Sequence, residues 1–216
     1  MTPQGLRYRA ALGAEGSAQE GSHGRVLANL RGVTAKRAMD LLEYQALVAA
    51  QERYYTLLSP QTGFTSSLLC QMHSDWLGGL YTWAGKYRTV ELQKGNFGWP
   101  PAYRVAENMA TFERELLALL TPCRPGPVDT VAGAIARVHA GLLLIHPFRE
   151  GNGRLARWLA DIMAIQAGYP VPDYAFVGRG SKERRARYIA AVSQGYVQNY
   201  APLAGLFAEA IRRAER

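Results

Sequence analysis

The stretch that decides the fold is residues 146–157, which read HPFREGNGRLAR. Pro147 ends the apolar helix expected over residues 129–145, because proline lacks a backbone N–H and clashes with the preceding turn. A second helix is expected to begin near Asn152 and to continue to about Ala167. The glycines beside Asn152 let backbone N–H groups approach a ligand closely, and a helix N-terminus favours anions. The stretch therefore predicts two helices joined by an anion-binding loop.

Charged side chains in the same stretch suit a polyphosphate. Arg154 and Arg157 are three residues apart, so they share a helix face and offer two guanidinium groups to phosphates. Glu150 is placed to hold Mg²⁺ against phosphate oxygens, since hard cations take carboxylate and phosphate ligands. Histidine titrates near neutral pH, so His146 is a natural general base for a hydroxyl nucleophile. These residues predict phosphoryl chemistry at the loop.

The same residues also have plain structural interpretations. A histidine at a helix end is often structural, two arginines can form a solvated face, and Glu150 can simply be an acidic group at a helix N-terminus. His139 lies seven residues before His146. Two helical turns separate these imidazoles by about 10.5 Å, so they are badly placed to share a metal ion. We therefore expect His139 to be a packed core histidine.

The rest of the chain predicts an all-α protein with one short β-hairpin. Helical patterns cover residues 33–58, 66–80, 102–120, 181–197 and 202–216. Residues 87–92 alternate and are β-prone, and the turn signal at 94–96 leads to Phe97, Gly98 and Trp99. An isolated hairpin is marginal, so we expect it to lie against helices or a ligand, and Trp99 to contact a partner.

Composition sets the broad class of the protein. The chain has 216 residues, of which 48% are hydrophobic and 19% charged, which is globular composition for one domain. We expect residues 1–29 to form a poorly ordered N-terminal segment and residues 30–216 to form the domain. Cys70 and Cys123 are too few for a disulfide framework, and no membrane span is expected. A cytoplasmic protein fits best, with export by a dedicated secretion system left open.

A net charge of +8 indicates that the protein attracts polyanions. The basic run at residues 179–187 reads RGSKERRAR. It is either a solvated helix face or a surface that attracts ATP, an acidic target or nucleic acid. Nucleic acid is not the expected partner, but a non-enzymatic basic binding module remains an alternative to an enzyme.

Residues 146–157 resemble the signature of the Fic family, H-x-F-x-[D/E]-G-N-[G/K]-R-x-x-R, and match it at all eight specified positions. Residues 85–92 resemble the strand that opens the family's flap hairpin, and residues 168–170 resemble the turn after the motif helix. Residues 188–203 resemble the closing helix of the family. The resemblance covers about residues 30–210 and implies the Fic fold, a helical bundle with a β-hairpin flap over the active-site loop.

The resemblance implies a protein adenylyltransferase, which transfers AMP from ATP to a Tyr, Thr or Ser hydroxyl of a target protein. It makes His146 the catalytic base and Glu150 the ligand of Mg²⁺, which bridges the α- and β-phosphates. The implied nucleotide-binding residues are Thr89, Val90, Glu91 and Leu92 in the flap, Gly151, Asn152 and Gly153 at the anion hole, Arg154 and Arg157 at the β- and γ-phosphates, and Tyr188 and Tyr196 at the adenine. The flap would register the target by strand addition.

Two departures from the family pattern bear on specificity and control. Tyr196 stands where the family often has Asn or Asp, so transfer of UMP, phosphocholine or phosphate remains an alternative, although Gly153 favours AMP. The family's inhibitory motif, [S/T]-x-x-x-E-[G/N], has no complete match: Leu116 follows the spacing at residues 111–115, and residues 17–21 are one residue short. A small antitoxin that supplies an inhibitory helix is therefore a possible partner, with this chain as the toxin.

Overall fold

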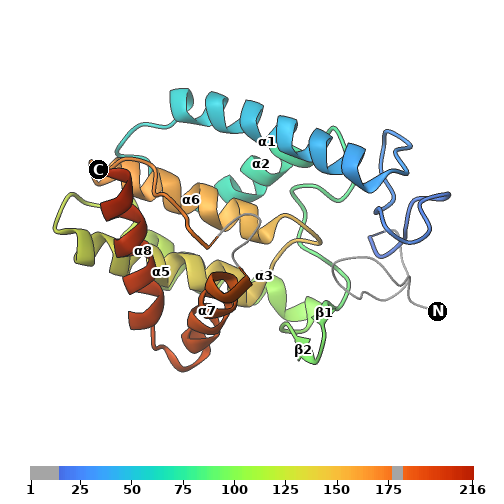
Figure 1. Cartoon of the computed structure of the whole chain (residues 1–216). Coiled ribbons are helices and arrows are strands. Elements are labelled where there is room, and N and C mark those ends of the chain that lie inside the picture. The colour runs from blue at the N-terminus through green and yellow to red at the C-terminus, as the bar shows by residue number, and fades with distance from the viewer. Residues whose placement is uncertain (1–14, 177–181) are drawn as a thin grey trace. The chain divides into compact units, whose positions relative to one another are not determined.

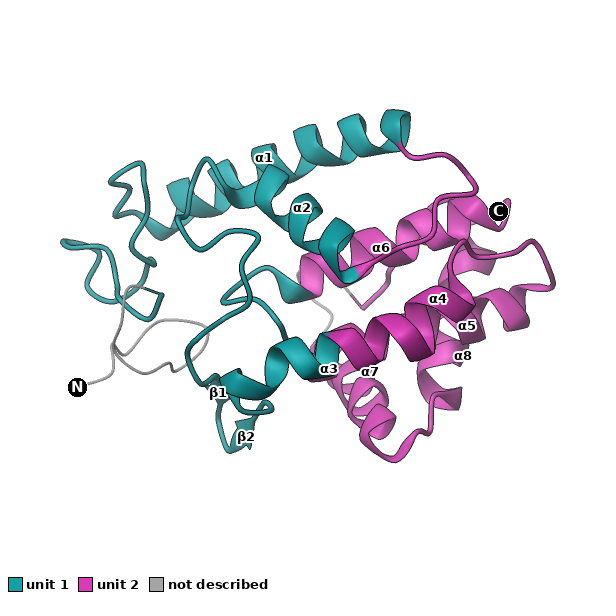
Figure 2. Ribbon diagram, turned by 180° about the vertical axis from the view of Figure 1, so that it is seen from behind, with its two compact units in different colours: residues 1–57, 66–109, 145–152 teal, residues 58–65, 110–144, 153–216 magenta. Residues whose placement is uncertain are grey.

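The computed structural model describes residues 15–176 and 182–216. The chain divides into two compact units, shown in separate colours in Figure 2. Unit 1 comprises residues 1–57, 66–109 and 145–152, and unit 2 comprises residues 58–65, 110–144 and 153–216. Part of the basic run, residues 179–181, lies outside the described residues.

Unit 1 is built on two packed helices, α1 (Lys36–Leu57) and α2 (Ser66–Leu77) (Figure 1). The core side of α2 buries Leu69, Met72, His73, Trp76 and Leu77. Glu43 of α1 is buried, and its polar groups have partners. The Tyr81 hydroxyl donates to the Glu43 carboxylate, 2.5 Å away, and Trp76 Nε1 donates to the Glu43 carbonyl oxygen. The two helices predicted over residues 33–58 and 66–80 are confirmed, with α2 ending before Gly78 and Gly79.

The β-hairpin is shorter than the sequence predicted. Strands β1 (Gln93–Lys94) and β2 (Phe97–Gly98) pair antiparallel around a turn in which Gly95 has φ +59°. One more backbone bond, from Trp99 N to Leu92 O at 3.1 Å, extends the hairpin. The following residues are Pro100 and Pro101, which have no N–H to donate, so pairing stops there. The strand predicted over residues 87–92 is therefore wrong, and this segment precedes the hairpin without regular secondary structure.

The hairpin leads into a short 3₁₀ helix, η1 (Ala102–Arg104), and then α3 (Val105–Phe112), which begins in unit 1 and ends in unit 2. A π-helical turn, η2 (Glu113–Leu117), and α4 (Ala118–Leu120) complete the helical stretch predicted over residues 102–120.

Two apolar helices follow, α5 (Val128–Ile145) and α6 (Asn152–Gln166), whose boundaries agree with the prediction. Both lie in unit 2 except for Ile145 and Asn152, which belong to unit 1. The core face of α6 buries Leu155, Trp158, Leu159 and Met163. Gly168 has φ +87°, the left-handed conformation with which glycine commonly ends a helix. Helices α7 (Lys182–Ser193) and α8 (Ala201–Ala214), with the 3₁₀ turn η3 (Gln194–Val197) between them, close the chain.

One helix in the described part of the chain is long and apolar enough to span a membrane. This is α5, with a mean hydropathy of 1.5 over 18 residues, half of them buried inside the structure. The buried helix of a globular core meets the same test. Because α5 packs Ile135, His139 and Leu142 into the core of unit 2, we describe it as a core helix.

The described part of the N-terminal segment has its own backbone pairing. Ala18 and Leu27 form an antiparallel bridge, Val26 and Leu27 are buried, and Leu30 N donates to Leu80 O at 2.9 Å. The segment predicted to be poorly ordered spans residues 1–29, of which residues 1–14 lie outside the described residues. Its boundary at residue 29 stays a prediction, and residues 15–29 belong to unit 1.

Candidate active site

His146 occupies a constrained position at the start of the loop in unit 1. Its backbone has φ +53°, which is uncommon for a residue with a Cβ, and its side chain is only 4% exposed. The indole of Trp99 stacks on the imidazole, with ring centroids 4.1 Å apart and planes at 30°. Trp99, expected to contact a partner, thus covers one face of the predicted base from the hairpin side.

Arg88 holds the hairpin to this loop, a role that the sequence did not reveal. Its guanidinium donates to the carbonyl oxygens of His146 at 2.8 Å, Val90 at 3.0 Å and Pro100 at 2.6 Å, with a longer bond of 3.4 Å to Ile145. Burial lowers the pKa of Arg88, and the nearby carboxylates of Glu91 and Glu15 act in the opposite direction. One buried guanidinium group therefore connects the hairpin to the backbone of His146, the predicted base.

The end of the loop is closed by side chains that bond to its backbone. Asn152 Nδ2 donates to Phe148 O at 2.7 Å, and Phe148 N donates to Asn152 Oδ1 at 2.9 Å. Glu150 Oε1 accepts the N–H of Gly151 at 2.9 Å. A carboxylate thus lies at the start of α6, where a helix N-terminus stabilises negative charge. Phosphate binding to this N–H requires Glu150 to move.

His73 of α2 contacts the loop through a hydrogen bond and a stacked ring. Its Nδ1 accepts the N–H of Gly85 at 2.8 Å, so its Nε2 carries the proton that it donates to Glu150 O, 3.0 Å away. The imidazole stacks on Phe148 with centroids 3.9 Å apart. No motif spacing links residue 73 to the loop, which is why sequence reasoning missed it.

Gly151 is the glycine that this packing requires. Its φ is +88°, and an added Cβ would lie 2.9 Å from Trp76 Cζ3 and 3.2 Å from His73 Nε2.

We expect Gly151→Ala to lower the free energy of unfolding by about 2–4 kcal/mol, through left-handed strain and overpacking. Urea denaturation measures this change. Gly153→Ala is the matched control, because its Cβ would meet only Arg157 Nη1 at 3.8 Å and its φ is not positive. Equal losses in the two variants would contradict the prediction.

The predicted flap residues have their own contacts in unit 1. The carboxylate of Glu15 accepts the backbone N–H of Thr89 at 3.1 Å and its hydroxyl at 3.2 Å. Val90 and Leu92 are buried with Trp99, and Glu91 Oε1 caps η1 by accepting Ala102 N–H at 2.9 Å. A nucleotide contact for Thr89–Leu92 therefore stays a prediction. Where the side chains already have partners within unit 1, such a contact would be made by the backbone.

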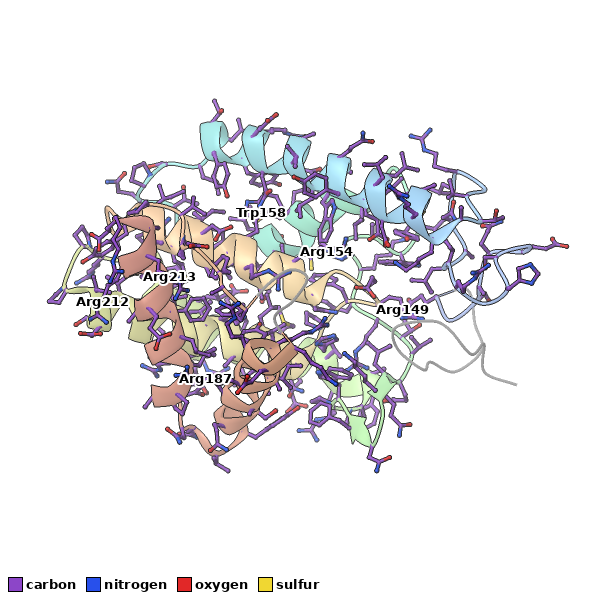
Figure 3. All side chains as sticks on the ribbon, in the orientation of Figure 1. Arg149, Arg154, Trp158, Arg187, Arg212 and Arg213 are labelled. Carbon is purple, nitrogen blue, oxygen red and sulfur yellow. The ribbon has the colours of Figure 1, made fainter. Side chains whose placement is uncertain are left out.

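Helix α6 carries the two predicted phosphate-binding arginines into unit 2. Gly153 and Arg154 follow Asn152 in its first turn, and Figure 3 shows Arg154 and Trp158 on this helix. Asp161 lies one turn beyond Arg157 and is 7% exposed. Its Oδ1 accepts the Tyr174 hydroxyl at 2.6 Å. Desolvation raises the pKa of Asp161 to about 7, although the Tyr174 hydrogen bond and the charge of Arg157 both lower it.

This shift makes the stability of the protein depend on pH. The folded state holds a proton that the unfolded chain, with an Asp pKa of 3.8, has released. The proton on Asp161 therefore stabilises the folded state fully below pH 3.8, and this stabilisation is lost as the pH rises through about 7. We expect the unfolding free energy of Asp161→Asn to fall less than that of the unmodified protein between pH 4 and pH 8, by roughly 2–4 kcal/mol. Urea denaturation across this range measures the difference, and Asp129→Asn, at an exposed ion pair with Arg212, is the control. Parallel pH profiles for the protein and Asp161→Asn would contradict the prediction.

The two tyrosines predicted to lie at the adenine differ in burial and in hydrogen-bond partners. Tyr188 of α7 contacts His139 Nε2 through its hydroxyl at 2.6 Å, and its ring stacks on Phe176 with centroids 4.5 Å apart at 6°. Tyr196 of η3 is 47% exposed and donates its hydroxyl weakly to Leu144 O at 3.4 Å. His139 is 1% exposed, so its prediction as a core histidine is confirmed.

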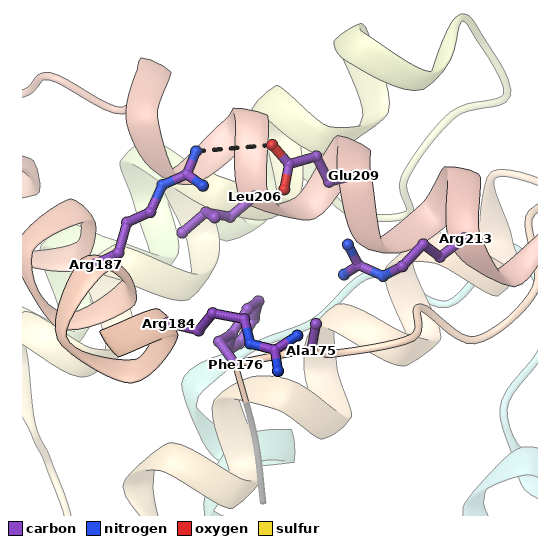
Figure 4. A pocket seen from close by; sticks show the side chains of 7 residues that line it. All are labelled: Ala175, Phe176, Arg184, Arg187, Leu206, Glu209 and Arg213. Atoms are coloured by element: carbon purple, nitrogen blue, oxygen red, sulfur yellow. Dashed lines mark ion pairs between the residues drawn. The ribbon is translucent and has the colours of Figure 1, made fainter. Parts of the chain in front are cut away.

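Arginines of the basic run line a separate hollow in unit 2 (Figure 4). The hollow has a volume of about 90 Å³ and is lined by Ala175, Phe176, Arg184, Arg187, Leu206, Glu209 and Arg213. Arg187 pairs with Glu209 at 3.7 Å, and Arg213 Nη2 donates to Asp173 O at 2.7 Å. The Arg187–Glu209 pair offsets part of the positive charge of the run.

A Mg²⁺ ion would find one protein ligand here. No group of three or more His, Cys, Asp or Glu side chains among residues 15–176 and 182–216 is arranged to hold a metal. The Glu150 carboxylate at the start of α6 fits a Mg²⁺ ion that takes most of its ligands from substrate phosphates and water. The donor set is therefore compatible with Mg²⁺ that arrives with a nucleotide.

Comparison with known proteins shows which family the central part of the chain resembles. The model of the Fic/DOC family matches residues 63–164, which contain α2, the hairpin, the loop and most of α6. Over this segment, slightly less than half of its length, the chain is similar to the Fic/DOC family.

Curated relatives carry names that describe an activity. The probable protein adenylyltransferase y4lH of Sinorhizobium fredii is 30% identical over 134 residues, covering 62% of this chain and 66% of the relative. Protein adenylyltransferase fic-1 of Caenorhabditis briggsae is 29% identical over 145 residues, covering 61% of this chain and 28% of the relative. The chain therefore spans between 28% and 66% of the length of these relatives.

Solved structures share the fold. The BepC effector protein of Bartonella tribocorum, determined with bound AMPPNP, aligns with a TM-score of 0.70 at 20% identity, covering 85% of this chain and 91% of BepC. The N-terminal Fic domain of a putative cell filamentation protein of Bartonella quintana, with bound ADP, gives a TM-score of 0.67 at 19% identity, covering 85% of this chain and 89% of that chain. The predicted fold, helical with a short β-hairpin, is confirmed.

Proposed function

We propose that this protein is an adenylyltransferase that moves AMP from ATP to a Tyr, Thr or Ser hydroxyl of a target protein. The observation that carries the proposal is the loop itself. His146 stands in a constrained conformation at one end, and the glycine-flanked start of α6 stands at the other, followed on that helix by Arg154 and Arg157. The names of the relatives and the nucleotides bound in BepC and the Bartonella quintana domain support the same chemistry.

In the proposed reaction, the residues of this chain position groups and move one proton. His146 accepts the proton of the target hydroxyl, whose oxygen attacks the α-phosphorus of ATP. The new bond joins that oxygen to the α-phosphorus, and the bond to the β-phosphate oxygen breaks, so pyrophosphate leaves. Arg154 and Arg157 hold the β- and γ-phosphates, and the N–H groups at Gly151, Asn152 and Gly153 cradle the anion. Mg²⁺, held by Glu150, would supply charge neutralisation at the phosphates.

The test is a comparison of label positions. The purified protein is incubated with a cell lysate and Mg²⁺, with ATP labelled at the α- or the γ-phosphate and with α-labelled UTP in parallel. Label from α-labelled ATP alone supports AMP transfer. Label from γ-labelled ATP alone assigns a kinase, and label from UTP assigns UMP transfer. Absence of label with every nucleotide overturns nucleotide-dependent transfer, and leaves phosphocholine transfer or a binding module.

We further propose a cytoplasmic toxin whose inhibitory helix comes from a separate antitoxin. The sequence contains no complete [S/T]-x-x-x-E-[G/N] motif. Cys70 and Cys123 are free thiols, which fits a reducing compartment. Burial raises the pKa of the Cys123 thiol to about 11, which keeps it unreactive. Expression in bacteria tests the toxin role: growth arrest that His146→Asn relieves supports it, and normal growth at equal protein levels contradicts it.

A further inference from the structure

His139 forms a hydrogen-bonded link between two helices of unit 2. It lies on α5, and its Nδ1 is 3.0 Å from the carbonyl oxygen of Ala156 on α6. Its Nε2 is 2.6 Å from the hydroxyl oxygen of Tyr188 on α7. The ring is 1% exposed, and Phe207 of α8 packs its edge against it with centroids 5.0 Å apart. The imidazole is therefore held on both nitrogens and by an aromatic neighbour.

The direction of each hydrogen bond follows from the partners. A carbonyl oxygen can only accept, so Nδ1 carries the proton and donates it to Ala156. In the neutral ring Nε2 is then an acceptor, and the Tyr188 hydroxyl must donate to it. The neutral form is favoured because burial and the charge of Arg157 lower the pKa of His139 to about 3, although the hydrogen bond to Ala156 acts in the opposite direction. The hydroxyl proton of Tyr188 is thus committed to His139.

The two ends of this link lie on elements with different proposed roles. Ala156 stands between Arg154 and Arg157 on the helix that carries the phosphate-binding arginines. Tyr188 is the residue that the family resemblance places at the adenine, and its ring stacks on Phe176 almost in parallel, at 6°. Fixing the Tyr188 hydroxyl and one face of its ring leaves little rotational freedom.

We propose that His139 is a positioning residue that sets the place of Tyr188 relative to the arginines of α6, and that Tyr188 meets the nucleobase through its ring and not by donating its hydroxyl proton. The inference rests on the proposed nucleotide-binding function. An aromatic ring can contact any base, so selection of adenine over guanine does not come from a hydrogen bond that this hydroxyl donates.

The test separates the base from the phosphates. Binding of ATP, GTP and inorganic tripolyphosphate is measured by titration calorimetry in one Mg²⁺ buffer. For His139→Ala, we expect the Kd of ATP to rise about tenfold and that of tripolyphosphate to stay within about twofold, because only the base side loses its support. His139→Gln, which keeps a donor and an acceptor, is expected to recover part of the loss. Arg154→Ala is the control that weakens both ligands.

A second variant keeps the inference testable if His139→Ala does not fold. Tyr188→Phe removes one hydroxyl from a half-buried ring, and we expect it to weaken ATP and GTP alike, leaving their Kd ratio unchanged within about twofold. A ratio that shifts about tenfold or more would show that the hydroxyl reads the base and would overturn the inference. Equal weakening of ATP and tripolyphosphate by His139→Ala, or no weakening, also overturns it. A wild-type protein that binds neither ligand overturns the proposed function as well.

Discussion

Replacing His146 with asparagine is expected to reduce AMP transfer by about 10²–10⁴-fold, the range that a general base contributes. Asparagine tolerates the left-handed backbone that His146 adopts at φ +53°, so the loop should keep its shape while it loses the group that accepts the proton. The Kd of ATP should change little, because His146 is proposed to act on the target hydroxyl and not on the phosphates. Initial rates with α-labelled ATP, together with calorimetric ATP binding, measure both effects.

A matched variant separates chemistry from packing around His146. Trp99 covers the imidazole with centroids 4.1 Å apart. Trp99→Phe keeps an aromatic face there, and we expect it to retain most of the transfer rate. If His146→Asn transfers AMP at a rate close to that of the unmodified protein, His146 is not the base. If both variants lose activity to the same extent, the stacked pair acts as a structural unit instead.

Replacing Arg88 with methionine is expected to lower the free energy of unfolding by about 3–5 kcal/mol, because several carbonyl oxygens lose their donor in a buried setting. Arg88 is 2% exposed and binds carbonyl groups on both sides of the hairpin and at the loop. Lysine keeps a charge but cannot form a planar fork, so Arg88→Lys should lose a similar amount of stability. Urea denaturation and thermal unfolding measure both variants.

The position of the loss is as informative as its size. Without Arg88, the amide of Trp99, bonded to Leu92 O at 3.1 Å, should exchange its hydrogen faster, because the hairpin is no longer tied to the loop. Arg104→Met is the control, since Arg104 pairs only with exposed Glu107 on the surface. A loss below about 1 kcal/mol for Arg88→Met, or unchanged exchange at Trp99, would contradict this role.

The sequence alone determined the features that depend on neighbouring residues. Pro147 ends α5 at Ile145, and Asn152 begins α6, because backbone chemistry acts over one helical turn. The family signature at residues 146–157 lies in one unbroken stretch, so its eight matched positions are readable without a structure. The strand expected over residues 87–92 was wrong because pairing depends on which donors lie across the hairpin, and there the partner residues are prolines.

Only the tertiary structure decided which distant side chains hold these local features in place. Arg88 and His73 reach the loop from 58 and 77 residues away, and Tyr188 reaches His139 across 49 residues. No spacing rule connects such pairs, because they meet through the packing of helices and not through the period of one element. The same packing buries these groups away from water, so each polar atom needs a specific partner, and folding selects that partner.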